Sequence, residues 1–285
     1  MTAVGTAVKT LDGTPASPRD AIPSFTTALA KHFPGAAKEA AFVDACASVL
    51  NKAGFREDNS IACVGICRDE ICGSLMTEVQ SKFGESFGFR GLGGFIFAGK
   101  TGFGAAHAHC PANPDGRHKY VYIVAPHIGI GQDGKLGSCN RAGIGHTSTA
   151  CGALAAFHGG LSSGSVSPQL AMDDLEMSAM SALLLQSIPW GTVPDLAELT
   201  KIAARIIAEK QVAAAIAATV DPAKADYAMI TGIQIHGPGL QQTYIMPIAD
   251  LCYAVVDGEK TMLSIPEAVA PLVKEVVMKA PFDGV

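Results

Sequence analysis

The most constraining feature of this chain is an apolar run, Ile61–Cys67, that ends in Arg68-Asp69-Glu70 and leads into a helical pattern. A short continuous apolar run is typical of a strand buried on both faces of a parallel sheet. In an open α/β sheet, ligands bind in the crevice beyond the carboxyl ends of the strands. Cys67 and Asp69 lie at such an end, so we expect both side chains to face one crevice. Taken alone, they would more simply be a core cysteine and a helix-capping aspartate.

The order of the predicted elements indicates an α/β fold. Apolar residues at helical spacing predict helices over residues 21–33, 36–53, 72–83, 168–185, from the capping box at Pro194-Asp195, and over 266–279. Strand patterns cover residues 61–67, 94–98, 119–126, 227–236, 243–256 and 261–265, the last two joined by an Asp257-Gly258 hairpin. Strands alternate with helices first and pair with each other later. We therefore expect a mostly parallel central sheet with antiparallel strands at one edge, flanked by helices.

The same patterns predict how the chain is divided. Residues 1–20 are rich in Gly, Thr, Ser and Pro and are interpreted as a loose N-terminal leader. No linker and no internal repeat interrupts residues 21–285, which we interpret as a single α/β domain.

Composition excludes several classes of function. A net charge of -5 and a pI near 5.9 provide no basic field for nucleic acid. No apolar stretch approaches the roughly 18 residues of a membrane span, and the N-terminus lacks a secretory signal pattern. Only 16% of the residues are charged, which indicates a large core, a subunit interface, or both.

Eight cysteines without a CxxC pair indicate a reducing compartment, with thiols that are free or metal-bound. A metal site in this chain would have to be assembled from residues that are distant in sequence.

Three potential metal ligands fall at equivalent places in the predicted fold. Cys67 and His127 each end a strand, and Cys151 begins a helix whose N-cap we place at Ser148-Thr149. Two thiolates and an imidazole suit tetrahedral zinc, and three protein ligands with an open fourth position are typical of a catalytic site. The amides of a helix N-terminus lower a cysteine pKa, which would favour the thiolate of Cys151.

A helper group is expected beside the metal. Because two thiolates cancel the charge of the zinc dication, a zinc-bound water is less acidic than in an all-histidine site. Asp69 is the candidate. It would accept a hydrogen bond from a zinc-bound hydroxide and so direct the lone pair of the hydroxide at an electrophile, while an arginine keeps the carboxylate ionised. A small, glycine-lined, apolar pocket would suit a small uncharged substrate.

These residues resemble a known family. The pattern is similar to the Cys-x-Asp-x-Arg and His-x-x-Cys-Gly motifs of β-carbonic anhydrases. It resembles more closely the limiting-CO2-inducible protein B (LCIB) family, over roughly residues 20–280, through Cys67-Arg-Asp-Glu, Gly99-Lys-Thr-Gly-Phe-Gly-Ala-Ala106, Pro126-His-Ile-Gly-Ile, Ala150-Cys-Gly-Ala-Leu and Ile188-Pro-Trp-Gly-Thr-Val-Pro-Asp-Leu. The resemblance implies a Zn2+ carbonic anhydrase (carbonate dehydratase) that interconverts CO2 and bicarbonate, in a homodimeric β-carbonic-anhydrase-like fold. It also implies a part in a CO2-concentrating mechanism in the cytoplasm or the chloroplast stroma, with no secretion.

The chain departs from the β-class motifs at two places. Residues 128–150 separate His127 from Cys151, so residues 129–146 form an insertion; His146 is a second candidate ligand, but His127 is preferred because it ends a strand. Ile71 stands at the β-class arginine position. The arginine partner of Asp69 is therefore sought elsewhere, first at Arg90 and second at Arg68.

Rival interpretations remain open. His107, His109 and Cys110 form an alternative metal cluster, and the glycine-rich segment 87–106 lacks the spacing of a phosphate-binding loop. The other thiols, Cys46, Cys63, Cys72, Cys139 and Cys252, are interpreted as core residues, and His236 as a strand end bonded to backbone. Other possible functions are a zinc hydrolase for a small amide or ester, and a catalytically silent family member that acts as a scaffold or binding subunit.

Overall fold

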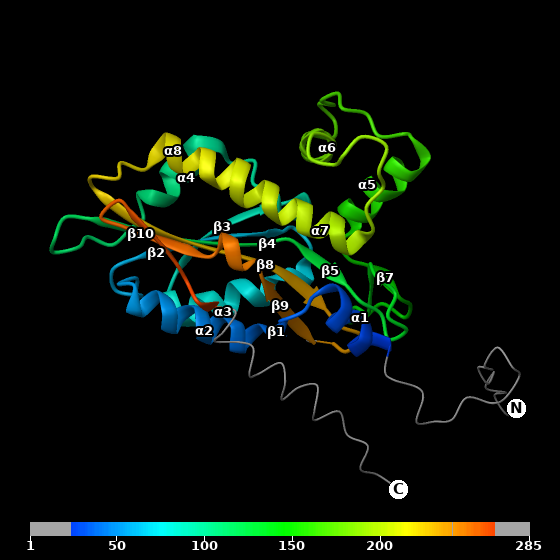
Figure 1. Cartoon of the computed structure of the whole chain (residues 1–285), viewed down its shortest axis with the longest axis horizontal. Helices are drawn as coiled ribbons and strands as arrows, with labels where there is room; N and C mark the ends of the chain where they lie inside the picture. Colours follow the sequence, from blue (N-terminus) through cyan, green and yellow to red (C-terminus); the bar gives the residue numbers. More distant parts are fainter. Residues whose placement is uncertain (1–23, 241, 266–285) are drawn as a thin grey trace, which may run out of the picture.

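A computed structural model of the chain describes residues 24–240 and 242–265 (Figure 1). The predicted leader over residues 1–20 and the predicted helix over residues 266–279 lie outside these ranges. Within them, a nine-stranded sheet forms the centre, with the strand order β1-β9-β8-β4-β2-β3 and with β5, β10 and β11 off this path.

The sheet is parallel in its middle and antiparallel on one side, as predicted. The parallel strands are β2 (Ile61–Cys67), β3 (Ser86–Gly91), β4 (His118–Ala125), β5 (His127–Gly129) and β8 (Ala225–His236). Antiparallel strands continue the sheet beyond β8: β1 (Ala37–Lys38), β9 (Thr243–Pro247), β10 (Tyr253–Val256) and β11 (Glu259–Met262).

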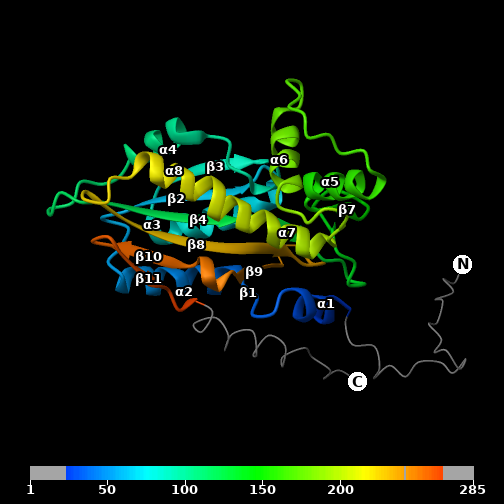
Figure 2. The ribbon, with the colours of Figure 1, turned by 45° about the horizontal axis from the view of Figure 1, so that its top comes forward.

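Helices cover both faces of the sheet. One face carries α2 (Glu39–Lys52) and α3 (Gly73–Phe83), and the other carries α4 (Gly99–His107), α7 (Leu196–Arg205) and α8 (Ala213–Thr219), as Figures 1 and 2 show. The remaining helices, α1 (Ser24–His32), α5 (Gly152–Ser163) and α6 (Leu175–Leu185), lie toward one end. Asp195 caps α7 by accepting a hydrogen bond from the backbone N–H of Glu198 at 2.8 Å, which confirms the predicted start of that helix. Within the described ranges, no helix has both the length and the apolar character that crossing a membrane requires.

Strand β2 is buried along its whole length, because β3 and β4 flank it and helices cover both faces. Its Gly65 is closely packed: a Cβ atom there would lie 2.8 Å from Ile96 Cδ1 and 3.0 Å from Val124 Cγ1, so a larger residue would force the Ile96 side chain to shift. The predicted buried strand that ends at Cys67 is confirmed.

The strand predicted over residues 94–98 is wrong. Strand β3 lies earlier in the chain, and a short 3-10 turn, Leu92–Gly94, follows it with positive φ angles at Gly93 and Gly94. These two glycines turn the chain away from the sheet. The side chain of Gln211, in the π-helix Ile206–Val212, accepts a hydrogen bond from the N–H of Ile96 and donates one to its carbonyl, both at 2.9 Å. A side-chain amide therefore occupies the place of a neighbouring strand.

Two other boundaries differ from the prediction. The strand predicted over residues 243–256 is divided into β9 and β10 by a 3-10 turn, Ala249–Leu251, and both strands pair with β8. The helix predicted over residues 168–185 begins only at Leu175.

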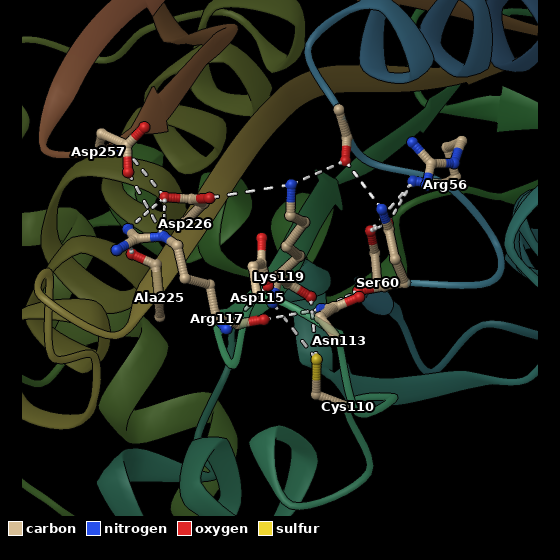
Figure 3. A network of polar contacts seen from close by, with 12 residues as sticks. Arg56, Ser60, Cys110, Asn113, Asp115, Arg117, Lys119, Ala225, Asp226 and Asp257 are labelled. Carbon is tan, nitrogen blue, oxygen red and sulfur yellow. Dashed lines mark hydrogen bonds and ion pairs between the residues drawn. The ribbon is translucent and has the colours of Figure 1, made fainter.

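A polar network fixes the amino-terminal ends of the parallel strands (Figure 3). Buried Asp226, near the start of β8, accepts hydrogen bonds from the Arg117 side chain and, at 3.0 Å, from the backbone N–H of Asp257 in the β10–β11 turn. Lys119 Nζ lies 3.9 Å from Asp226 Oδ2 and donates to the carbonyl of Gly54 at 3.2 Å. Burial alone would raise the pKa of Asp226, but the hydrogen bonds from Arg117 hold that pKa below its usual value.

We expect Asp226→Asn to lower the free energy of unfolding by about 2 kcal/mol, because the buried carboxylate accepts charged hydrogen bonds from Arg117 that a neutral amide replaces only weakly. Urea denaturation followed by circular dichroism measures this change. The control is Asp58→Asn, which removes an exposed ion pair with Arg56 and should change stability by less than about 0.5 kcal/mol. Equal effects of the two substitutions would contradict a structural role for the buried network.

Candidate metal centre

The three predicted ligands converge at the carboxyl end of the sheet. Cys67 is the last residue of β2, His127 begins β5 directly after Pro126, and Cys151 is the N-cap of α5. Their potential ligand atoms all lie within 4.8 Å of one another, and the two Sγ atoms are 3.8 Å apart. His146, the second candidate ligand, is exposed and lies outside this group.

The surroundings of His127 fit a metal ligand. Its side chain is 0% exposed, and neither ring nitrogen has a hydrogen-bond partner. A buried polar group without a partner costs stability, which metal coordination would offset. Two thiols and an imidazole form the soft donor set that zinc prefers, so the residues present fit the ion that was predicted.

The pKa values of the two cysteines shift in opposite directions. Hydrogen bonds from Cys151 and, to a smaller extent, from Cys72 hold the pKa of Cys67 far below its usual value. The same contact with Cys67, together with burial, raises the pKa of Cys151. As predicted, the amides of Ala153 and Leu154 at the helix start act to lower the Cys151 pKa, but the contact with Cys67 and burial outweigh them.

The start of α5 also differs from the prediction. Ser148-Thr149 does not cap the helix; it forms strand β7 (Ser148–Thr149), paired with β6 (Ser138–Cys139). Ser148 Oγ instead accepts a hydrogen bond from Arg141 Nε at 2.7 Å. The hairpin formed by β6 and β7 therefore positions an arginine.

Arg141 is the arginine that pairs with Asp69. Its Nη1 donates to Oδ1 at 2.6 Å and its Nη2 to Oδ2 at 2.7 Å, which is a bidentate pair. Nη1 also donates to Glu70 and Nη2 to the carbonyl of Thr149. Burial acts to raise the pKa of Asp69, but these hydrogen bonds and nearby positive charge hold it below its usual value. Asp69 Oδ2 lies 3.8 Å from His127 Nε2, beside the metal ligands.

The prediction that Arg90 or Arg68 pairs with the Asp69 carboxylate is wrong. Arg90 Nη2 donates to the backbone carbonyl of Asp69 at 3.3 Å, and Arg68 forms an ion pair with Glu176 of α6. A signal for Arg141 existed in the sequence. It is the one arginine in residues 129–146, a segment that lies between the predicted ligands His127 and Cys151.

The rival cluster does not assemble in the described part of the chain. His107 Nε2 is 2.6 Å from the hydroxyl of Tyr122, the ring of His109 packs against Phe87, and Cys110 accepts a hydrogen bond from Lys119 N. These three residues are engaged in packing and local bonds.

Two residues near the centre were missed. Cys72, interpreted as core, lies 3.9 Å from His236 Nε2, and the rings of His236 and His127 are 5.3 Å apart. Each residue alone has an ordinary sequence context, so no local pattern identifies the pair.

A cavity of about 470 Å³ opens onto the centre. Charged residues line one part of it, and the walls also include apolar side chains: Cys67, Arg68, Asp69, Glu70, Leu92, Arg141, Ile144, Cys151, Gly152 and Ala153. Most of the lining surface is apolar, in agreement with the apolar pocket expected from the sequence.

The sequence of this chain matches the model of a known family over most of its length. The model of the family described as limiting CO2-inducible proteins B/C beta carbonic anhydrases matches residues 36–254. The chain belongs to this family. The resemblance inferred from the sequence blocks is confirmed, and so is the β-carbonic-anhydrase-like α/β fold.

Solved structures agree with the assignment to the LCIB/C family. The crystal structure of limiting CO2-inducible protein LCIB is 32% identical, with a TM-score of 0.70 over 84% of this chain and 98% of that chain. The structure of PtLCIB4, a homolog of LCIB, matches in fold with 23% identity and a TM-score of 0.68, over 84% of this chain and 99% of that chain. No curated protein sequence matches the chain.

We expect Cys67→Ala and Cys151→Ala each to reduce the zinc content of the purified protein by at least about tenfold, because each removes one of three ligands. Elemental analysis by mass spectrometry, with protein quantified in the same sample, measures the ratio of zinc to chain. Cys46→Ala is the matched control, since Cys46 is equally buried but lies in α2. Unchanged zinc in either ligand variant would refute this donor set.

Proposed function

We propose that this protein is a zinc-dependent carbonic anhydrase that interconverts CO2 and bicarbonate. The observation that carries the proposal is the bidentate Arg141–Asp69 pair beside a buried group of two cysteines and one histidine. Membership of the LCIB/C family supports the same chemistry.

Cys67, His127 and Cys151 would hold the zinc ion. When bound, zinc supplies a Lewis acid that lowers the pKa of a water molecule. The protein supplies a rigid donor set, because the three side chains come from two strand ends and a helix N-terminus in the buried core. The geometry of the centre therefore does not depend on a mobile surface loop.

Asp69 would accept a hydrogen bond from the attacking water and fix its orientation. Arg141 keeps the carboxylate ionised, since its hydrogen bonds hold the Asp69 pKa below the usual value. Because both carboxylate oxygens are bonded to Arg141, the same pair restrains Asp69 from moving onto the metal as a ligand. One arginine thus supports both the charge and the position of the catalytic carboxylate.

The cavity can accommodate both forms of the substrate. Leu92, Ile144 and Ala153 offer apolar wall to uncharged CO2, while Arg68 and Arg141 bring positive charge toward bicarbonate. The exposed mouth allows direct exchange with solvent, and Arg68 at that mouth is held by its ion pair with Glu176.

The volume of the cavity keeps a zinc hydrolase as a second candidate, because about 470 Å³ has room for a small ester or amide. Stopped-flow CO2 hydration with zinc analysis separates the candidates. Zinc with turnover supports the anhydrase, zinc without it supports the hydrolase or a silent binding subunit, and absence of both supports the silent subunit.

We also propose a homodimer in a reducing compartment, either the cytoplasm or the chloroplast stroma. Trp190 is 99% exposed, and Leu170, Met172 and Val193 are exposed as well, a pattern that favours a protein partner. All eight cysteines are free thiols, which suits a reducing compartment. A monomeric mass by light scattering would contradict the dimer.

We expect Asp69→Asn to retain zinc but to lower kcat/KM for CO2 hydration by at least about 100-fold, because the amide cannot accept the hydrogen bond as an anion does. Glu70→Gln is the control, since Glu70 also contacts Arg141 but is exposed, and its activity should stay within about twofold of wild type. Full activity of the Asp69 variant would refute the role assigned to this residue.

We expect Arg141→Lys to retain zinc and to lower kcat/KM by about 10- to 100-fold, because lysine cannot form the bidentate pair. The matched control is Arg90→Lys, which leaves the Asp69 carboxylate untouched and should change kcat/KM little. Stopped-flow assays of both variants at equal zinc content give the comparison. A larger loss in the Arg90 variant would restore the pairing predicted from the sequence.

A further inference from the structure

A second group of potential ligands shares His127 with the first. Cys72, His127 and His236 are all buried, and their potential ligand atoms lie within 4.8 Å of one another. Cys72 ends the short turn Glu70–Cys72 after β2, and His236 ends β8 two residues beyond the backbone partner of His127. His127 therefore belongs to both groups.

The environment of His127 calls for a second partner. A metal-binding histidine almost always gives its other ring N–H to a carboxylate, a carbonyl or water. In the described structure neither nitrogen of His127 has such a bond, and the nearest carboxylate oxygen, on Asp69, is 3.8 Å away and engaged by Arg141. The Sγ atom of Cys72 and a ring nitrogen of His236 lie within 4.8 Å of a ring nitrogen of His127.

We propose that Cys72, His127 and His236 form a second metal position, suited to a soft monovalent cation of the Cu(I) class. One thiolate and two imidazoles form the trigonal donor set that copper favours. A single thiolate neutralises a single positive charge, whereas a dication would leave net charge in a buried place without a free carboxylate. Binding replaces the S–H proton of Cys72 by the metal and releases that proton to solvent.

The second position has its own access route. His236 lines a cavity of about 620 Å³, together with Glu39, Ser74, Asn140 and Arg141. Cys67 and Cys151 line the other cavity. A cation could therefore reach His236 without passing the zinc ligands.

The shared histidine makes the two positions competitive. A neutral imidazole offers one lone pair, so His127 serves one metal at a time. A soft monovalent cation bound at Cys72 and His236 would take His127 from the zinc ligands and lower zinc affinity. The inference goes beyond the proposed function, because it requires no CO2 hydration.

The test isolates the second position. In the Cys67→Ser/Cys151→Ser variant, Cu(I) is supplied anaerobically from a competing bicinchoninate buffer, and bound copper is counted per chain. We expect about one Cu(I) per chain, with X-ray absorption showing one sulfur and two nitrogen ligands. Adding Cys72→Ser or His236→Asn should raise the Kd for Cu(I) by at least about 100-fold, whereas adding Cys46→Ser should not change it.

Absence of copper binding, binding that is insensitive to both Cys72→Ser and His236→Asn, or coordination by sulfur alone would overturn the proposal. If the double variant does not fold, the zinc-loaded wild type replaces it, and zinc release on Cu(I) addition is followed with a chromogenic chelator. Release should then require at least about tenfold more Cu(I) in Cys72→Ser and in His236→Asn, and equal release in all three proteins would reject the site.

The outcomes are separable from those of the proposed function. CO2 hydration and zinc content of the wild type are measured without copper, so a negative copper result leaves the anhydrase intact. Loss of zinc binding in Cys67→Ala with copper binding retained would show two distinct donor sets.

Discussion

Two buried sulfurs that are 84 residues apart in sequence lie 3.8 Å from each other, and the rest of the centre depends on that contact. Such proximity is unfavourable for two thiolates, so without a metal one sulfur keeps its proton and donates it to the other. The parallel arrangement of β2 and β4 and the position of α5 impose the contact, because they bring a strand end and a helix start to the same rim. A dication bound by both sulfurs would offset the repulsion between two thiolates, because each thiolate would then be a metal ligand.

The polar network and the candidate metal ligands lie at opposite ends of the parallel strands. At the amino-terminal ends of β4 and β8, the network around Asp226 pins strands to the adjacent turns. At the carboxyl ends of β2 and β8 and after β4 lie Cys67, His236 and His127. Strand β8 contributes to both, because it contains Asp226 near its start and His236 at its end.

How much could be predicted from the sequence depended on whether the signal was local. Strand β2 and the three candidate metal ligands were found because a buried apolar run, a strand end and a helix start are readable in a few residues each. Strand β3 was missed because Ser86-Phe-Gly-Phe-Arg-Gly91 contains glycines in place of β-branched residues, while the neighbouring Phe95-Ile96-Phe97 is more strand-like yet is bonded by Gln211. The partner of Asp69 could not be derived from spacing, since it comes from a hairpin 72 residues away. Cys72 and His236 meet only through packing of a turn against the end of β8.

The segment between His127 and Cys151 is a loop whose two ends would rest on the same ion. Closing a chain segment at its base removes much of the conformational freedom that it would otherwise lose on ordering. The guanidinium of Arg141, carried near the middle of that segment, therefore meets Asp69 at a smaller entropic cost once the base is closed. Binding of a metal at the base of this segment and formation of the Arg141–Asp69 ion pair would for this reason favour each other.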